Sequence, residues 1–292
     1  MKTPLISLCC ILTWLLCSSW GFYAHGRINY LAVFCLPPEP ARFFKSNIKY
    51  LNAHAVDPDK RRYADTAEGP RHYLDVELYE SNIDSIPRKW KDALKKYGAA
   101  KLDADGILPW QIHLSYQRLV QAFELRDSLR ILKAAADLGH YVADAHVPLH
   151  TTANHNGQLS NQVGIHAFWE SRIPELFADH YNFLVGGAQY ISAPLQESWK
   201  IVSHSHILAD STLRMESIVS KAFSDSRKYE FSKRKGKLLK QYSSAYALAY
   251  SNSMNHMVEK QMSAAVLAVG SFWYSAWVDA GQPDLHHWTT LR

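Results

Sequence analysis

The chain has 292 residues, 47% of them hydrophobic, which supports a large buried core, and no repeat, low-complexity tract or Gly/Ser linker divides it. Its net charge of +5 is small and spread along the chain, so no basic arm that would grip a nucleic-acid duplex is present. Only Cys35 lies outside the first nineteen residues, so no internal disulfide is expected once these are removed.

The first nineteen residues have the features of a secretory signal peptide. Lys2 supplies the basic start, residues 5–16 form a short apolar core, and Cys17-Ser18-Ser19 is a small-residue cleavage site. That core is too short for a transmembrane span. We therefore expect residues 20–292 to be secreted or periplasmic, with no transmembrane segment after processing. A lipoprotein with a lipidated Cys17 is less favoured, because Leu16 is large for that processing.

Helical patterns dominate the rest of the chain, and few stretches alternate as strands do. Helices are expected over residues 39–52, 84–97, 109–127, 128–145, 165–178, 192–207, 227–250 and 255–279. The last contains an uncharged run, Ala264 to Val278. We interpret it as a buried central helix, because a membrane span needs about 20 apolar residues. The predicted fold is all-α, with residues 20–292 in a single compact multi-helix domain.

A histidine-rich segment carries the strongest functional signal. His140 and Asp144 are four residues apart, as are His166 and Glu170, and His150 lies between the two pairs. Residues four apart share one face of a helix, so each pair can hold one metal ion. Imidazole and carboxylate without thiolate suit zinc better than calcium or magnesium. A single buried histidine is usually structural, but this combined spacing indicates a metal centre.

Further candidate ligands precede this segment. Trp20 and His25 directly follow the expected cleavage site, and Asp57 and His72 come next along the chain. The chain therefore carries a Trp, a His, an Asp and a His in that order, followed by His-x3-Asp-x5-His and then His-x3-Glu. In this order of motifs it resembles the superfamily of zinc-dependent phospholipases C and single-strand-specific zinc nucleases of the P-one and S-one type. The resemblance is weaker after Phe177. It implies an all-helical fold and three zinc ions.

The resemblance also implies which residues hold each ion. The first set is Asp57, His72, His140 and Asp144. The second set is His150, His166 and Glu170, which leaves one position open for water or substrate. The third set is the amino group and carbonyl of Trp20, His25, and the second oxygen of Asp144. Removal of the signal peptide would complete this third set. Candidates to hold the free N–H groups of the histidines are Asp75, Asp137 and Asn154.

The charge of such a site favours a phosphate ester. Three zinc ions outweigh the carboxylates of Asp57, Asp144 and Glu170, so the cluster would attract a phosphodiester anion. Zinc brings the pKa of bound water near neutrality and stabilises the leaving oxygen. Asp57 is expected to orient or deprotonate this water. Lys60 is a candidate to bind the scissile phosphate, as a basic residue does in the nucleases of the superfamily, and a solvated surface lysine is the alternative.

The sequence leaves the substrate open. The Trp-Gly opening, the step from Trp20 to His25 and the presence of Lys60 resemble the nucleases, so the interpretation leans towards single-stranded DNA or RNA. Glu170 resembles the phospholipases C, which makes phospholipid the alternative substrate. A non-catalytic zinc-binding protein is a further alternative, although structural zinc sites are closed by four protein ligands and the second set has three. No stable protein partner is implied.

Overall fold

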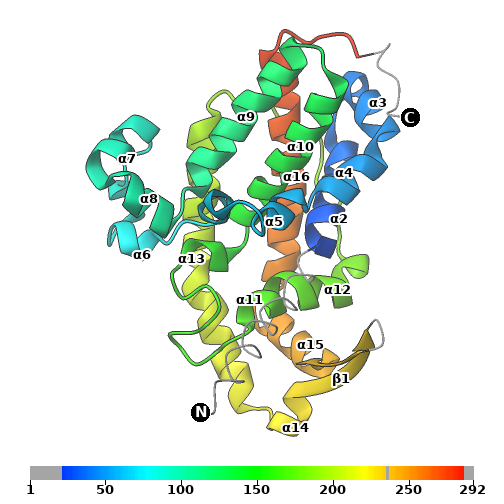
Figure 1. Cartoon of the computed structure of the whole chain (residues 1–292). Helices are drawn as coiled ribbons and strands as arrows, with labels where there is room; N and C mark the ends of the chain where they lie inside the picture. The colour runs from blue at the N-terminus through cyan, green and yellow to red at the C-terminus, as the bar shows by residue number, and fades with distance from the viewer. Residues whose placement is uncertain (1–21, 235–236, 286–292) are drawn as a thin grey trace, which may run out of the picture.

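The computed structural model describes residues 22–234 and 237–285, which form a mostly helical protein (Figure 1). The expected signal peptide, residues 1–19, and the expected ligand Trp20 lie outside the described residues. The all-α prediction is confirmed. Among the described helices, none combines the length and apolarity that crossing a bilayer requires.

The first half of the chain consists of short helices followed by two long ones. Its α-helices are α2 (Phe22–Ala32), α3 (Pro38–Ser46), α4 (Ile48–His54), α5 (Asp57–Arg61), α6 (Val76–Tyr79), α7 (Trp90–Tyr97), α8 (Ala99–Asp105), α9 (Leu108–Glu124) and α10 (Ser128–Ala145). Its 3₁₀ turns are η1 (Val33–Cys35), η2 (Thr66–His72) and η3 (Ile83–Ser85).

The second half starts with a 3₁₀ turn, η4 (Pro148–Thr151), and a loop. A near-continuous helical segment follows, made of α11 (Ile165–Ala167), the π-helical turn η5 (Phe168–Arg172), α12 (Ile173–Phe177) and η6 (Ala178–His180). The remaining elements are α13 (Pro194–Lys221), α14 (Asp225–Lys228), β1 (Tyr229–Arg234), β2 (Lys237–Tyr242), α15 (Ser244–Ser253) and α16 (Met257–Asp279).

Helices α10 and α16 run through the middle of the molecule, and α2, α9 and α13 pack around them (Figure 1). Trp273 of α16 is fully buried, stacks on Phe44 with ring centroids 5.0 Å apart, and donates its indole N–H to the Ala135 carbonyl of α10 at 2.9 Å. The uncharged run of the sequence therefore forms the expected buried central helix.

A close contact between α2 and α10 sets the position of the functional residues. A Cβ atom on Gly139 would lie only 2.0 Å from the Oδ1 of Asn29, so α10 has no room there for a larger residue. Asn29 also donates to the Ala136 carbonyl at 3.2 Å. This approach brings the ring of His25 on α2 against that of His140, with centroids 4.2 Å apart.

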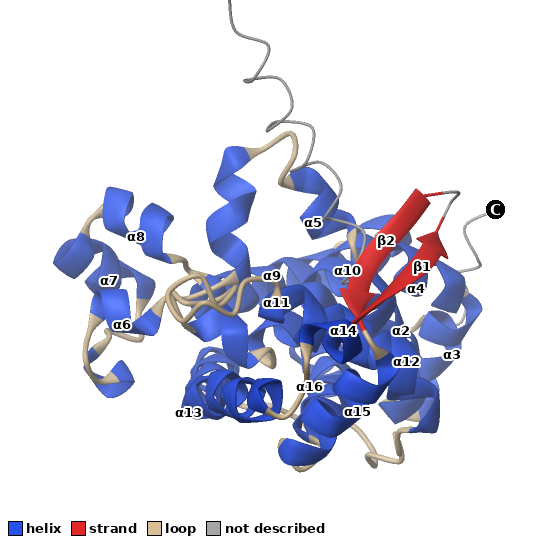
Figure 2. Ribbon diagram, turned by 90° about the horizontal axis from the view of Figure 1, so that it is seen from below, coloured by secondary structure: helices blue, strands red, loops and turns tan. Residues whose placement is uncertain are grey.

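The expected helix over residues 227–250 is wrong in its first part. The chain instead forms α14 and then the antiparallel β1–β2 hairpin, with Tyr229 opposite Tyr242, before α15 begins at Ser244 (Figure 2). Lysine and leucine gave this stretch helical character, but Gly236 lies between the two strands and glycine disfavours a helix interior. Aromatic residues also favour paired strands when they stack across them, as Tyr229 and Tyr242 do at 5.1 Å.

Candidate metal centre

Eight histidine and carboxylate side chains from separate parts of the chain converge on one site. They come from α2, α5, η2, α10, η4, α11 and η5, and they are His25, Asp59, His72, His140, Asp144, His150, His166 and Glu170. Three groups of donor atoms can each surround a cation: His25 with His140 and Asp144; Asp59 with His72 and His140; and His150 with His166 and Glu170. The structure thus brings together every expected ligand among the described residues except Asp57.

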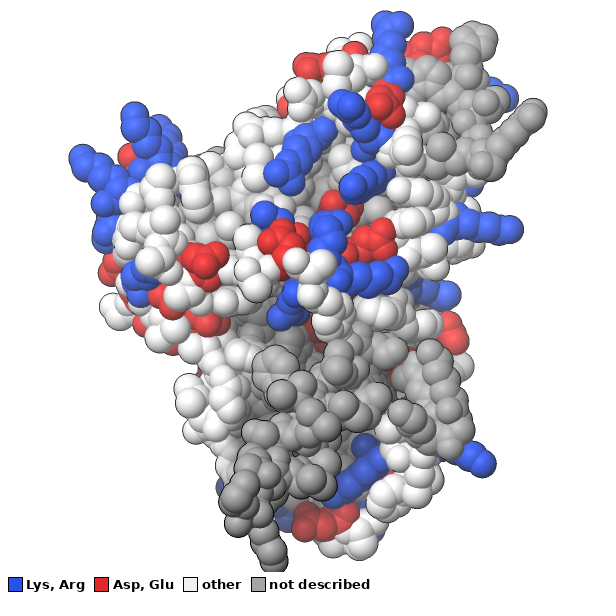
Figure 3. All heavy atoms as spheres, in the orientation of Figure 1, with Lys and Arg blue, Asp and Glu red and all other residues white. Residues whose placement is uncertain are grey.

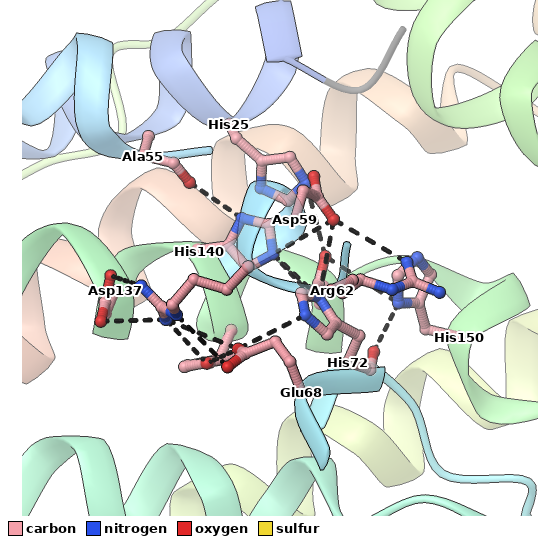
Figure 4. Close-up of polar contacts among 12 residues, drawn as sticks. His25, Ala55, Asp59, Arg62, Glu68, His72, Asp137, His140 and His150 are labelled. Atoms are coloured by element: carbon pink, nitrogen blue, oxygen red, sulfur yellow. Dashed lines mark hydrogen bonds and ion pairs between the residues drawn. The ribbon is translucent and has the colours of Figure 1, made fainter. Parts of the chain in front are cut away.

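The first part of the site is built around the carboxylate of Asp144, one helical turn after His140. Its Oδ2 lies 2.9 Å from Nδ1 of His72 and 3.2 Å from Nε2 of His140, and its Oδ1 lies 3.4 Å from Nε2 of His25. Asp59 adds an oxygen 3.8 Å from the nitrogens of both His72 and His140 (Figure 4). The two oxygens of Asp144 therefore face different donor groups, as a bridging carboxylate requires.

The second part is built around Glu170. Its Oε2 lies 2.8 Å from Nε2 of His166 and 3.4 Å from Nε2 of His150, and the two histidine nitrogens are themselves 2.8 Å apart. Its Oε1 lies 3.0 Å from Nε2 of His25, which belongs to the first part. Glu170 therefore connects the two halves of the centre.

The chemistry of these donors fits divalent cations. Asp144 is 1% exposed, and a buried carboxylate needs a compensating positive charge. Burial would raise the pKa of Asp144, but the charges of His140 and His150 and hydrogen bonds from His140 and His72 hold this pKa well below its usual range. Burial would lower the pKa of His150, but the charge of Asp144 and contacts with Glu170 raise it to about 9. Protons and metal ions compete for the same nitrogens, so the site favours cations.

Backbone carbonyls orient two of the histidines. The Nδ1 of His140 lies 2.8 Å from the Ala55 carbonyl, and the Nδ1 of His150 lies 2.5 Å from the His72 carbonyl. A carbonyl accepts, so each Nδ1 carries a proton and each Nε2 is the nitrogen that faces the cluster, where a metal ion can replace its proton. This arrangement is the one that histidine ligands adopt around metals.

Glu68, the carboxylate behind His72, was not among the residues predicted from the sequence. Glu68 is fully buried, accepts a hydrogen bond from Arg71 at 2.6 Å and a short one from Tyr141, and lies 3.6 Å from Nε2 of His72. Its partners outweigh burial and keep its pKa well below the usual range. The available sequence signal was its place four residues before His72. The expected partner Asp137 instead accepts from Arg61 at 3.1 Å.

Asp57 and Lys60, the two expected catalytic residues, lie outside the cluster. The Asp57 carboxylate is 2.6 Å from Nδ1 of His54 and 2.8 Å from Nζ of Lys60, and the Lys60 side chain is 53% exposed. Asp59 takes the place expected for Asp57 because α5 turns residue 59 towards α10. Arg62, unlike Lys60, lies beside the cluster, with its guanidinium 3.9 Å from Oδ1 of Asp59 (Figure 4).

Together, the fold and the site define a mostly helical protein with a buried histidine and carboxylate cluster suited to several metal ions. The sequence profile of the zinc-dependent phospholipase C family matches residues 24–233, so the chain belongs to that family. The family match supports the expected enzyme class, a zinc-dependent hydrolase of phosphoric ester bonds. The family match agrees with phospholipid, the alternative substrate. It gives no support to nucleic acid, the substrate that the sequence interpretation favoured.

The solved structures that match this one include two clostridial alpha-toxins. The alpha-toxin of Clostridium absonum is 10% identical with a TM-score of 0.51, over 89% of this chain and 64% of the toxin chain. The alpha-toxin of Clostridium perfringens, from an avian strain, is 13% identical with a TM-score of 0.49, over 91% of this chain and 65% of the toxin chain. The chain thus spans slightly less than two thirds of these toxins, and the first likeness shows the fold. No curated protein matches the sequence.

Proposed function

We propose that this protein is a zinc-dependent phospholipase C that hydrolyses the phosphodiester bond between the glycerol backbone and the head group of phospholipids. The single observation that carries the proposal is the convergence of three donor groups on the shared carboxylates of Asp144 and Glu170, in a chain of the zinc-dependent phospholipase C family. Three zinc ions, and export by the signal peptide, are parts of the same proposal.

The proposed ligands follow the observed geometry. One zinc would be held by Asp59, His72, His140 and Asp144, a second by His150, His166 and Glu170, and a third by His25 and the second oxygen of Asp144. The expected contribution of Trp20 to the third ion stays a prediction. Zinc, when bound, lowers the pKa of water and stabilises charge on phosphoryl oxygens.

The open side of the cluster supports a position for the substrate. His72, His140 and Asp144 are at most 2% exposed, whereas the side chains of Asp59 and His166 are 25% and 27% exposed. The phosphodiester therefore approaches between α5 and α11. Lys and Arg side chains gather over α5 on this face of the molecule, mixed with acidic ones (Figure 3).

Arg62 is the basic residue best placed to bind the substrate phosphate. Its side chain is 49% exposed, and among the described residues its ion pair with Asp59, at 3.9 Å, is a long one that leaves the guanidinium free to turn. Guanidinium donates two parallel hydrogen bonds to phosphate oxygens, so it can fix the orientation of the phosphodiester. Lys60, by contrast, is already bound to Asp57 at 2.8 Å.

The test is hydrolysis by zinc-loaded mature protein, with and without a chelator. The substrates are phosphatidylcholine, p-nitrophenylphosphorylcholine, single-stranded DNA and RNA, assayed side by side. We expect chelator-sensitive release of phosphocholine from the first two, and its loss in His150→Ala. Cleavage of nucleic acid alone would overturn the proposal in favour of a nuclease. Zinc binding without any turnover would instead identify a non-catalytic zinc-binding protein. Amino-terminal analysis of exported protein tests whether the mature chain begins at Trp20.

A further inference from the structure

The β1–β2 hairpin presents an apolar and basic face. Residues directly opposite in antiparallel strands point to the same side, so the pairs Phe231 with Lys240 and Lys233 with Leu238 share one face with Tyr229 and Tyr242. Phe231 is 67% exposed and Leu238 is 69% exposed. Both lysines are exposed, and none of these six side chains is acidic.

The base of the hairpin is fixed to the segment that carries two proposed ligands. Tyr242 stacks on Phe168 with ring centroids 4.0 Å apart, and Phe168 lies between His166 and Glu170 in the sequence. On the opposite face of the hairpin, Arg172 donates to Glu230 at 2.6 Å and to the Tyr242 carbonyl at 3.2 Å. The exposed face is therefore held at a defined position relative to the metal centre.

A second exposed apolar segment lies on the other side of this region. The loop of residues 152–164, which joins His150 to His166, exposes Leu159 at 75% and Val163 at 66%. The loop reaches the hairpin at its end, since a Cβ atom on Gly164 would lie 3.9 Å from the Tyr242 hydroxyl. In both ribbon views, α11 lies between the loop and the hairpin (Figures 1 and 2).

We propose that the hairpin face and this loop dock the protein on the surface of an anionic phospholipid membrane, with the metal centre close to the lipid head groups. The inference rests on the proposed phospholipase function and names how its substrate is reached. Exposed aromatic and aliphatic side chains enter the boundary between head groups and acyl chains, while lysines are attracted to anionic lipids. Phe231 and Leu238 with Lys233 and Lys240 combine both properties on one face.

The experiment measures flotation of full-length mature zinc-loaded protein with vesicles of phosphatidylcholine, with or without phosphatidylserine, after brief incubation in the cold. One variant combines Phe231→Ser with Leu238→Ser, and another combines Lys233→Gln with Lys240→Gln. The matched control combines Leu125→Ser with Leu129→Ser, which are 56% and 51% exposed at the turn between α9 and α10. That turn lies at the opposite end of the molecule from the hairpin (Figure 1).

We expect each hairpin variant to lower the vesicle partition coefficient roughly 10- to 30-fold, and the control to leave it unchanged. The lysine variant should lose its defect on vesicles without phosphatidylserine or at high salt. Circular dichroism and turnover of water-soluble p-nitrophenylphosphorylcholine should stay at the wild-type level, which excludes misfolding as the cause.

The outcomes separate this inference from the proposed function. If the hairpin variants bind vesicles as well as wild type and turn over the soluble substrate normally, the proposed docking surface is wrong. The proposed enzymatic activity would still be supported. Hairpin-dependent vesicle binding without hydrolysis of any phosphodiester would support docking and overturn the proposed activity. A change in oligomeric state of the hairpin variants by light scattering, without a change in vesicle binding, would assign the face to a second copy of the chain and overturn the membrane proposal.

Discussion

Replacing Glu68 by glutamine tests how the protein prepares His72 for a metal ion. Glu68 is fully buried and lies 3.6 Å from Nε2 of His72, while the Nδ1 of His72 faces Asp144 at 2.9 Å. A carboxylate behind a ligating histidine orients its ring and raises its basicity, and losing such a partner costs about 10- to 100-fold in metal affinity. We expect Glu68→Gln to raise the dissociation constant for zinc by about 10- to 100-fold, which corresponds to roughly 1.4–2.7 kcal/mol of binding free energy.

The same substitution also affects stability, so the assay must separate the two effects. Arg61 and Arg71 keep the second acidic partners Asp137 and Asp65, and their side chains are 32% and 27% exposed. Glu68→Gln should therefore lower the unfolding free energy by about 1–3 kcal/mol. This is less than the loss caused by removing one partner of a fully buried ion pair. Urea unfolding of the metal-free protein measures this loss, and competition with a chromophoric chelator measures zinc affinity.

The control is Asp137→Asn, which removes a partner of Arg61 but is not in contact with His72. It should lower the unfolding free energy while zinc affinity stays within about threefold of wild type. If Glu68→Gln binds zinc as tightly as wild type, Glu68 only stabilises the fold and the positioning role is refuted.

Three other predictions concern the site and its support. Arg62→Ala should lower kcat/KM for p-nitrophenylphosphorylcholine roughly 10- to 100-fold, because a phosphate contact is lost. Lys60→Gln should change kcat/KM less than about twofold. A larger effect of Lys60→Gln in steady-state kinetics would contradict the assignment of Arg62. Zinc at 100 times its Kd should stabilise the protein by about 2.7 kcal/mol in thermal unfolding, and an unchanged melting temperature would argue against binding to the folded state. Burial raises the pKa of Glu216, but hydrogen bonds from Tyr246, Gln162 and Lys228 leave it below the usual value. The Glu216 carboxylate therefore contributes its full stabilisation above pH ~4.5, and this contribution is lost as the pH falls through the pKa of Glu216 in the folded protein. In urea unfolding measured at a series of decreasing pH values, the difference in unfolding free energy between wild type and Glu216→Gln should shrink.

Local spacing allowed the sequence to predict part of the site. His140 and Asp144 occupy successive turns of α10, and His166 and Glu170 lie four apart in the α11–η5 segment, so helix geometry alone places each pair together. The all-α fold and the buried central helix followed from the same periodicity. The resemblance assigned Asp57, whereas Asp59 joins the cluster. Both stand in one short helix, and only the packing of α5 against α10 decides which carboxylate faces the histidines.

The sequence by itself therefore determined the types of the candidate ligands, their pairing along helices and the helical fold, because these depend on residues a few positions apart. Only the tertiary structure decided that Asp59 joins the cluster, that Glu68 stands behind His72, and that residues 229–242 form a hairpin beside Phe168. Each of these depends on contacts between segments far apart in the chain, and the periodicity of one segment carries no information about its distant neighbours.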